Sequence, residues 1–223
     1  MQVMLLDIEG TTTPIDFVYL TLFPYARKRL DEFVADKLDK TDLHLLEMEY
    51  RGDNSLSKPA WKIPPSKYLH WLMEQDRKSP ALKNIQGKIW KAGYEDGSLK
   101  GEVFPDVVPA MKRWKAQGKR VAIYSSGSVL AQKLLFKYNR DGDISEMIDG
   151  YFDTAVGPKK EPESYMEIAK RLGVPSSEIF FISDSAAECE AAELAGCAVR
   201  YSVRPGNNIE QVSFERIESF EEI

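Results

Sequence analysis

The sequence contains little cysteine and little histidine, with two residues of each among 223. Cys189 and Cys197 lie in a segment expected to form a helix and the strand after it. Two cysteines are too few for a disulfide framework or a cysteine-rich metal site. We therefore expect buried thiols in a reducing compartment and a cytoplasmic location. His44 and His70 both fall in a helical segment described below, and we expect packed or surface residues rather than catalytic ones.

A net positive charge and long apolar runs are also missing. The formal net charge is -5, and no basic face is evident, so we expect neither nucleic acid nor an anionic membrane as a partner. Local basic residues can still bind a small anionic substrate. No apolar run approaches the roughly 20 residues that span a bilayer, and the first apolar run begins without the segments of a signal peptide. Repeats, low-complexity segments and heptads are absent as well, and we expect a monomer.

What the sequence does contain is an alternation of strands and helices. Short apolar runs predict strands, and periodic apolar positions between them predict helices. The expected strands are residues 3–8, 119–125, about 150–156, 179–183 and 197–203, and the expected helices are residues 107–114, 129–138, 164–172 and 186–195. This alternation is typical of an α/β, Rossmann-like fold with a mainly parallel sheet that helices cover on both faces.

Residues 16–100 interrupt the alternation. Long amphipathic patterns and proline-rich gaps predict a helical bundle there, with helices at residues 20–33, 43–49, 68–73 and 82–94. We therefore expect two domains: a Rossmann-like core of residues 1–15 and 101–223, and a helical domain of residues 16–100 inserted after the first strand. The acidic tail, residues 217–223, is expected to take no part in chemistry.

The first expected strand leads into the most informative motif, Asp7-Ile8-Glu9-Gly10-Thr11-Thr12. Alternation along a strand places Asp7 and Glu9 on the same side and Ile8 on the other. Neighbouring carboxylates repel each other unless a cation lies between them or one of them holds a proton. Such a pair suits Mg²⁺ and phosphate chemistry. Acidic residues and glycine are also ordinary turn formers, so the motif alone leaves a structural role open.

Three further loops carry polar side chains toward the same edge of the predicted sheet, because ligands bind at the carboxyl ends of parallel strands. Ser125-Ser126-Gly127 follows the second strand, Lys159 follows the third, and Asp184 ends the fourth. Each has a structural alternative, since serine and aspartate are favoured helix N-caps and a single lysine is usually solvated. The combination of four such loops nevertheless favours one shared site.

Phosphoryl transfer is the chemistry that this combination suits. Asp7 can attack phosphorus and form an aspartyl-phosphate, and Glu9 can protonate the leaving alcohol and later deprotonate water. The two serines and the amides of their turn can bind phosphate oxygens. Lys159 can neutralise charge on the transferred group, and Asp184 can complete a Mg²⁺ site with Asp7.

On these motifs the sequence resembles the haloacid dehalogenase superfamily of phosphotransferases. Asp7-Ile8-Glu9-Gly10-Thr11 looks like its first motif, Ser125 like its second, Lys159 like its third and Asp184 like its fourth. The resemblance covers the whole chain and implies that the inserted helices are the cap domain of that family. Most phosphatases of the superfamily have aspartate where this chain has Glu9.

Glu9 and several longer stretches resemble one branch of the superfamily, the enolase-phosphatases of methionine salvage. These stretches are DIEGTTTPIDFV, LFPYA, DRKSPALKNIQGKIW, GEVFPDVVPAMKRW, YSSGS and KKEPESY. The resemblance implies a bifunctional enzyme that enolises 2,3-diketo-5-methylthiopentyl-1-phosphate and then dephosphorylates it to an acireductone. It implies Asp7 and Glu9 as catalytic residues and Mg²⁺ as the cofactor, bound by Asp7, Glu9 and Asp184. The implied substrate-binding residues are Ser125, Ser126 and Lys159.

Some assignments stay open at the level of the sequence. The family pattern of glycine, any residue and lysine selects Lys159 over Lys160. The pattern does not identify the base for enolisation, for which Glu9 is the nearest candidate. Three alternative functions remain. The first is a phosphatase of the same fold that acts on a different small phosphomonoester. The second is a haloacid dehalogenase, although that chemistry has no use for Asp184 with a divalent cation, and the third is a phosphate-binding module without catalysis.

Overall fold

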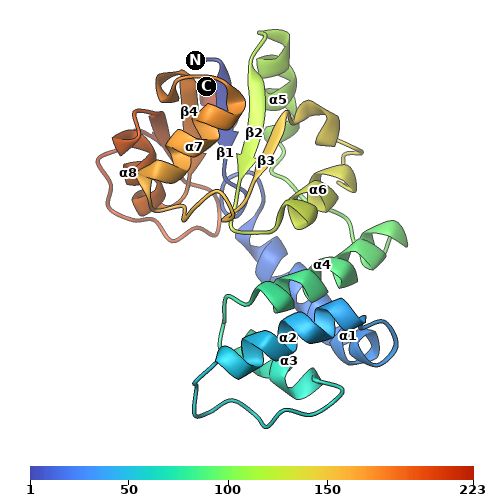
Figure 1. The fold of residues 1–223 in the computed structure, drawn as a ribbon. Helices are drawn as coiled ribbons and strands as arrows, with labels where there is room; N and C mark the ends of the chain where they lie inside the picture. Colours follow the sequence, from blue (N-terminus) through green and yellow to red (C-terminus); the bar gives the residue numbers. More distant parts are fainter. The chain divides into compact units, whose positions relative to one another are not determined.

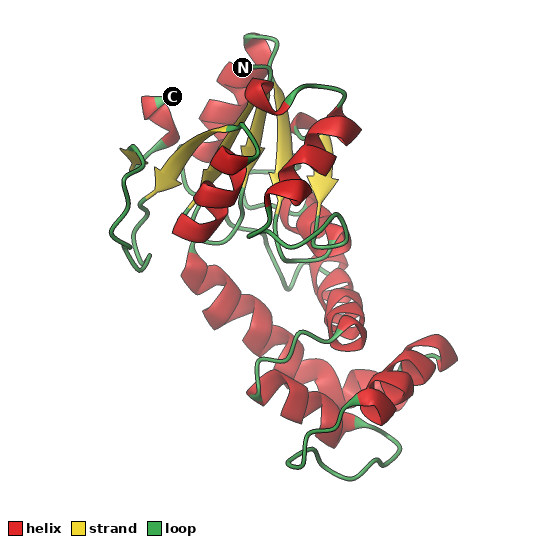
Figure 2. Cartoon of the chain, turned by 60° about the vertical axis from the view of Figure 1, so that its left-hand side comes forward, coloured by secondary structure: helices red, strands yellow, loops and turns green.

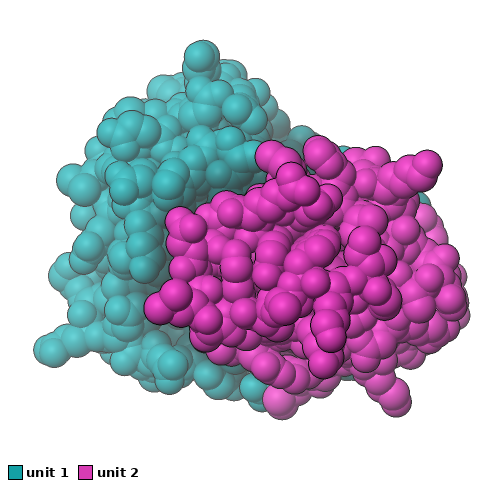
Figure 3. Space-filling model, turned by 60° about the horizontal axis from the view of Figure 1, so that its bottom comes forward, with its two compact units in different colours: residues 1–18, 100–223 teal, residues 19–99 magenta.

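The computed structural model describes all 223 residues and divides into two compact units. The first unit contains residues 1–18 and 100–223, and the second contains residues 19–99 (Figure 3). The boundaries predicted from the sequence lay after residue 15 and after residue 100. A π-helix, Phe17–Leu22, carries the chain across the first observed boundary.

A six-stranded sheet forms the centre of the first unit, in the order β3-β2-β1-β4-β5-β6 with every neighbouring pair parallel (Figure 1). The strands are β1 Val3–Leu6, β2 Arg120–Tyr124, β3 Gly150–Phe152, β4 Ile179–Ser183, β5 Ala198–Ser202 and β6 Arg216–Ile217. The predicted Rossmann-like α/β fold is confirmed. The sixth strand was not predicted, because two residues are too few to show a period.

Helices cover both faces of this sheet (Figure 2). They are α5 Val107–Ala116, α6 Val129–Lys137, α7 Pro162–Leu172 and α8 Ala186–Leu194, with short 3-10 helices at Ser145–Met147, Ser176–Glu178 and Phe220–Glu222. On one face, residues of α7 and α8 share an apolar core with Leu5 and Phe181. Strands buried on both faces need apolar residues at every position, which explains the uninterrupted run in β1.

The second unit is helical, as the sequence predicted, and has its own apolar core. Its helices are α1 Phe23–Asp36, α2 Lys40–Gly52, α3 Ser66–Glu74 and α4 Pro80–Glu95. Leu30, Leu46 and Ile85 are fully buried between them. The indole of Trp90 is also buried and donates a hydrogen bond to the Leu22 carbonyl at 2.9 Å. Four further aromatic rings pack together in this unit: Tyr50, Trp61, Tyr68 and Trp71.

The acidic tail folds back onto the first unit. Phe220 is fully buried, and its ring centroid lies 5.4 Å from that of Trp114 in α5. Arg113 donates hydrogen bonds to the carbonyl oxygens of Phe220 and Ile223, each at 2.6 Å. The Phe220 amide donates to Asp106 at 2.6 Å. The tail therefore forms part of the packed core.

The scarce residues lie where the sequence suggested. Cys189 and Cys197 are free and buried, and burial raises the pKa of each thiol to about 12. His44 is exposed, and His70 Nε2 lies 3.0 Å from the carboxylate of Asp31 within the second unit. None of the helices combines the length and apolar composition needed to cross a membrane.

Candidate active site

The carboxyl ends of β1 and β4 mark the point where the strand order of the sheet changes direction. The chain builds β2 and β3 on one side of β1 and builds β4, β5 and β6 on the other. In open parallel sheets, ligands bind in the crevice at such a point. Asp7 directly follows β1, and Asp184 directly follows β4, so both predicted acids lie at this edge.

A tight turn after β1 directs the first two acids. The strand ends at Leu6, two residues earlier than predicted. The chain turns there because the Ile8 carbonyl accepts hydrogen bonds from the amides of residues 11, 12 and 13 at 3.1, 3.0 and 2.9 Å. The predicted strand alternation therefore does not apply to Asp7 and Glu9. The turn, rather than the strand, brings both carboxylates to the site.

Asp7 lies at the centre of the site and is 3% exposed. Its Oδ1 accepts hydrogen bonds from Lys159 Nζ at 2.6 Å and from the Ile8 amide at 2.8 Å. Its Oδ2 accepts a hydrogen bond from the Ser183 hydroxyl at 2.9 Å. Because both oxygens are held, the carboxylate has one orientation toward an incoming ligand, which is what a nucleophile requires.

Lys159 is a buried cation between two carboxylates. Its Nζ lies 2.6 Å from Asp7 Oδ1 and 2.6 Å from Glu188 Oε2. Burial opposes its charge, but the two carboxylates outweigh burial and raise the pKa of Lys159 above its ordinary value. The Tyr165 hydroxyl donates to the Lys159 carbonyl at 2.7 Å and fixes this loop. The neighbouring Lys160 is exposed.

Glu188, in α8, is a site residue that the sequence prediction missed. Besides Lys159 it contacts the Ser183 hydroxyl at 2.9 Å, and the same hydroxyl also bonds to Asp7. Burial, followed by the negative charge of Asp7, raises the pKa of Glu188 to about 7. The signal that could reveal it is its place in the first turn of α8, directly after the loop that carries Asp184.

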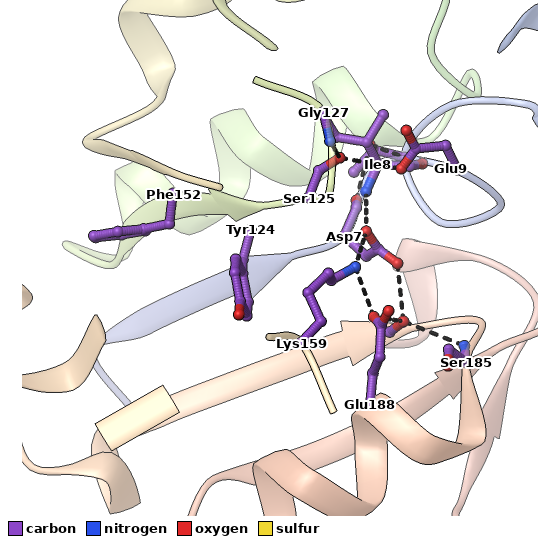
Figure 4. Close-up of polar contacts among 12 residues, drawn as sticks. Asp7, Ile8, Glu9, Tyr124, Ser125, Gly127, Phe152, Lys159, Ser185 and Glu188 are labelled. Carbon is purple, nitrogen blue, oxygen red and sulfur yellow. Dashed lines mark hydrogen bonds and ion pairs between the residues drawn. The ribbon is translucent and has the colours of Figure 1, made fainter. Parts of the chain in front are cut away.

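Glu9 lies on the other side of Asp7, against the turn that follows β2 (Figure 4). The Ser125 hydroxyl donates to Glu9 Oε2 at 3.1 Å, and the Gly127 amide donates to Ser125 Oγ at 3.1 Å. Burial and then the charge of Asp7 raise the pKa of Glu9. This shift favours a glutamic acid that can hold and deliver a proton.

The remaining serines of this turn have different positions. Ser126 is exposed. Ser128 is the N-cap of α6, since its hydroxyl accepts a hydrogen bond from the Ala131 amide at 3.3 Å. The sequence left open whether Ser125 and Ser126 serve as helix N-caps. In the structure, Ser128 is the N-cap residue.

Asp184 reaches from the end of β4 to the turn after β1. A Cβ atom at Gly10 would lie 2.1 Å from Asp184 Oδ2 and 2.8 Å from Asn207 Oδ1. These oxygens fill the space that a side chain at residue 10 would need, and the φ of +66° at Gly10 also favours glycine. Burial and then the charge of Asp7 raise the pKa of Asp184 to about 7.

The site has more acidic groups than cations: Asp7 is buried, and Glu9, Asp184 and Glu188 are half-buried. Lys159 forms ion pairs with Asp7 and Glu188, and its charge also acts on Glu9 and Asp184. No three of these carboxylates converge closely enough to form a preformed cation cluster. The donor set nevertheless fits Mg²⁺, since it offers hard carboxylate oxygens and lacks the positive charge that a divalent cation would bring.

Known proteins resemble this chain in both sequence and fold. A family model for haloacid dehalogenase-like hydrolases matches residues 1–196. Enolase-phosphatase E1 of Synechococcus elongatus is 49% identical, covering 99% of this chain and 96% of that protein, and enolase-phosphatase E1 of Salmo salar is 45% identical, covering 92% and 85%. The crystal structure of the UTR4 protein from Saccharomyces cerevisiae superposes with a TM-score of 0.84 at 37% identity, covering 100% of this chain and 99% of that one. The chain is a phosphatase of the hydrolase class and belongs to the enolase-phosphatases among the haloacid dehalogenase-like hydrolases.

Proposed function

We propose that this phosphatase is a Mg²⁺-dependent, bifunctional enolase-phosphatase that converts 2,3-diketo-5-methylthiopentyl-1-phosphate to an acireductone in methionine salvage. The observation that carries the proposal is the buried Asp7 carboxylate, held by Lys159 at 2.6 Å and by Ser183 at 2.9 Å. A fixed nucleophile beside a permanent positive charge suits phosphoryl transfer. The relatives named enolase-phosphatase support the substrate.

Dephosphorylation proceeds in two steps through the proposed residues. Asp7 attacks phosphorus, and an aspartyl-phosphate forms as the bond to the leaving alcohol breaks. Glu9 protonates that alcohol, then takes a proton from the water that hydrolyses the aspartyl-phosphate and releases phosphate. Lys159 neutralises the oxygens of the transferred group, while Ser125 and Ser126 bind the phosphate.

Asp7, Asp184 and, while it holds no proton, Glu9 would hold the Mg²⁺ ion, which would supply positive charge for the phosphoryl oxygens and for an enolate oxygen. The carboxylates exceed the charge of Lys159, so without a cation they repel an anionic substrate. Glu188 shares both Lys159 and the Ser183 hydroxyl with Asp7, and so helps to hold the Lys159 side chain in the site.

Enolisation requires a base beside the diketone, and Glu9 is our candidate. Its carboxylate removes the proton next to the carbonyl, and Lys159 stabilises the oxygen on which negative charge develops. Glu9 then holds the proton that the leaving alcohol needs in the second reaction. One residue whose pKa is raised thus serves both half-reactions.

The proposed enzyme acts on one small phosphorylated diketone, without nucleic acid or membrane as a partner. We further propose that it is a cytoplasmic monomer. Size-exclusion chromatography with light scattering measures the oligomeric state, and a mass near 25.3 kDa is the expected result.

Asp7→Asn tests the mechanism. We expect phosphate release to fall by at least about a thousandfold, because the amide is a poor nucleophile. We expect enolisation to persist, so that ultraviolet absorbance shows an enol that accumulates. Asp16→Asn, at an exposed acid, is the control and should keep full activity. Full phosphate release by Asp7→Asn would exclude Asp7 as the nucleophile, and wild-type turnover of other phosphomonoesters alone would exclude the proposed substrate.

A further inference from the structure

The chain after β5 makes a tight turn, Arg204-Pro205-Gly206-Asn207, beside the candidate site. The Asn207 amide donates to the Arg204 carbonyl at 3.1 Å, and Gly206 has a φ of +90°, as in a type II turn with proline in second position. Arg204 is buried and donates to Asp106 at 2.8 Å and to the Thr11 carbonyl at 3.2 Å. The turn is therefore anchored to the loop that carries Asp7 and Glu9.

The orientation of the Asn207 side-chain amide is fixed by its neighbours. Its Nδ2 donates to the Gly10 carbonyl at 2.8 Å and to the Ser202 carbonyl at 3.4 Å. Both neighbours are acceptors, so the nitrogen must face them and Oδ1 must face away. That Oδ1 is buried and has no hydrogen-bond partner in the protein. A buried acceptor left unsatisfied costs about 1–3 kcal/mol, which indicates a missing donor.

The orphan oxygen faces the same point as a carboxylate of the proposed cation site. The position of a Cβ at Gly10 lies 2.8 Å from Asn207 Oδ1 and 2.1 Å from Asp184 Oδ2. Asn207 Oδ1 has no hydrogen-bond partner in the protein, and an ionised Asp184 carboxylate beside it offers only acceptor oxygens. A water molecule bound to a cation at Asp184 supplies the donor, because Mg²⁺ keeps several of its water ligands in proteins.

We propose that Asn207 is a positioning residue of the cation site, whose Oδ1 accepts a hydrogen bond from a water on the cation held by Asp184. The proposal rests on the Mg²⁺ dependence proposed above. Partners of this kind orient the ligands around a metal, and their loss typically lowers metal affinity by about 10–100-fold. Asn207 thus contributes to Mg²⁺ binding from a loop outside the four family motifs.

Mg²⁺ titration calorimetry on the wild type and on Asn207→Ala, without substrate, tests the proposal. We expect the variant to bind Mg²⁺ about 10–100-fold more weakly. Equal affinities in the two proteins would overturn the proposed role of Asn207 but not the proposed Mg²⁺ dependence. A wild type that binds no Mg²⁺ would overturn the proposed cation dependence itself, so the two failures are distinguishable.

Two further variants separate the amide oxygen from the anchoring of the loop. Ser202→Ala removes another donor to the Gly10 carbonyl, at 3.3 Å, but leaves Asn207 in place, so its Mg²⁺ affinity should stay within about twofold of wild type. Asn207→Asp keeps an acceptor oxygen and loses the Nδ2 donor, and we expect affinity at least equal to wild type. A loss in either variant as large as the loss expected for Asn207→Ala would assign the effect to loop anchoring. If Asn207→Ala does not fold, tighter Mg²⁺ binding by Asn207→Asp than by the wild type supports the proposal, and weaker binding overturns it.

Discussion

At the scale of single residues, Lys159 is the counter-charge for two buried carboxylates. Its replacement by methionine leaves Asp7 and Glu188 without their ion pair. We expect Lys159→Met to lower the free energy of unfolding by about 3 kcal/mol and to abolish phosphate release. Urea denaturation and a phosphate assay measure the two effects.

Lys160→Met is the matched control, because the neighbouring side chain is exposed. Its free energy of unfolding should change by less than about 0.5 kcal/mol. Equal stabilities of the two variants would show that the buried ion pairs contribute nothing net to the fold.

The same scale shows which site residues a sequence can reveal. Asp7, Lys159 and Asp184 follow or lie near strand ends, where a parallel sheet gathers its polar residues, so their positions were predictable. Glu188 was missed because glutamate and alanine are ordinary helix formers in α8. Asn207 was missed because asparagine after glycine is an ordinary turn former. Only its contact with Gly10, 197 residues away in the chain, gives it a place in the site.

At the scale of elements, the C-terminal 3-10 helix Phe220–Glu222 is expected to stabilise the first unit through one ring. Phe220 is fully buried and packs on Trp114. Phe220→Ala leaves a cavity there, and we expect the free energy of unfolding to fall by about 3–5 kcal/mol. Thermal and urea unfolding measure the change. Glu221→Ala, at an exposed neighbour, should behave like the wild type, and a Phe220→Ala protein as stable as this control would contradict the packing role.

The elements themselves differ in how well the sequence predicted them. β4 has the predicted bounds, because five residues in sequence are apolar or small and buried. β1 is shorter than predicted. Ile8 is apolar like the strand residues, so the sequence pattern includes it in the strand. The hydrogen bonds that turn the chain there leave no mark on the hydrophobic pattern. α2 extends to Lys40 because Asp39 caps it, accepting from the Asp42 amide at 2.8 Å, and polar ends carry no apolar period.

At the scale of the whole molecule, stability should depend on pH and on the cation together. Burial and then the charge of Asp7 raise the pKa of Asp184 and Glu188 to about 7, above the value of about 4 in an unfolded chain. The folded protein then binds more protons than the unfolded chain between about pH 4 and 7. Without a cation, the stability that these groups contribute is present below about pH 4 and is lost as the pH rises through 7.

Because Mg²⁺ competes with those protons, its effect on the melting temperature should grow with pH. We expect a larger Mg²⁺-induced rise in Tm at about pH 8 than at about pH 5.5, measured by scanning calorimetry with Mg²⁺ or with chelator. Asp184→Asn should flatten this dependence. A rise of equal size at both pH values would contradict it.

The central position of β1 also has a consequence for how the protein is made. Leu5 pairs with Ala122 on one side and with Phe181 on the other, so β1 is synthesised long before either of its neighbouring strands. Pairing over such long separations is slow, and an unpaired apolar strand invites aggregation. The strand that leads into Asp7 is therefore more exposed to aggregation in the nascent chain than in the folded enzyme.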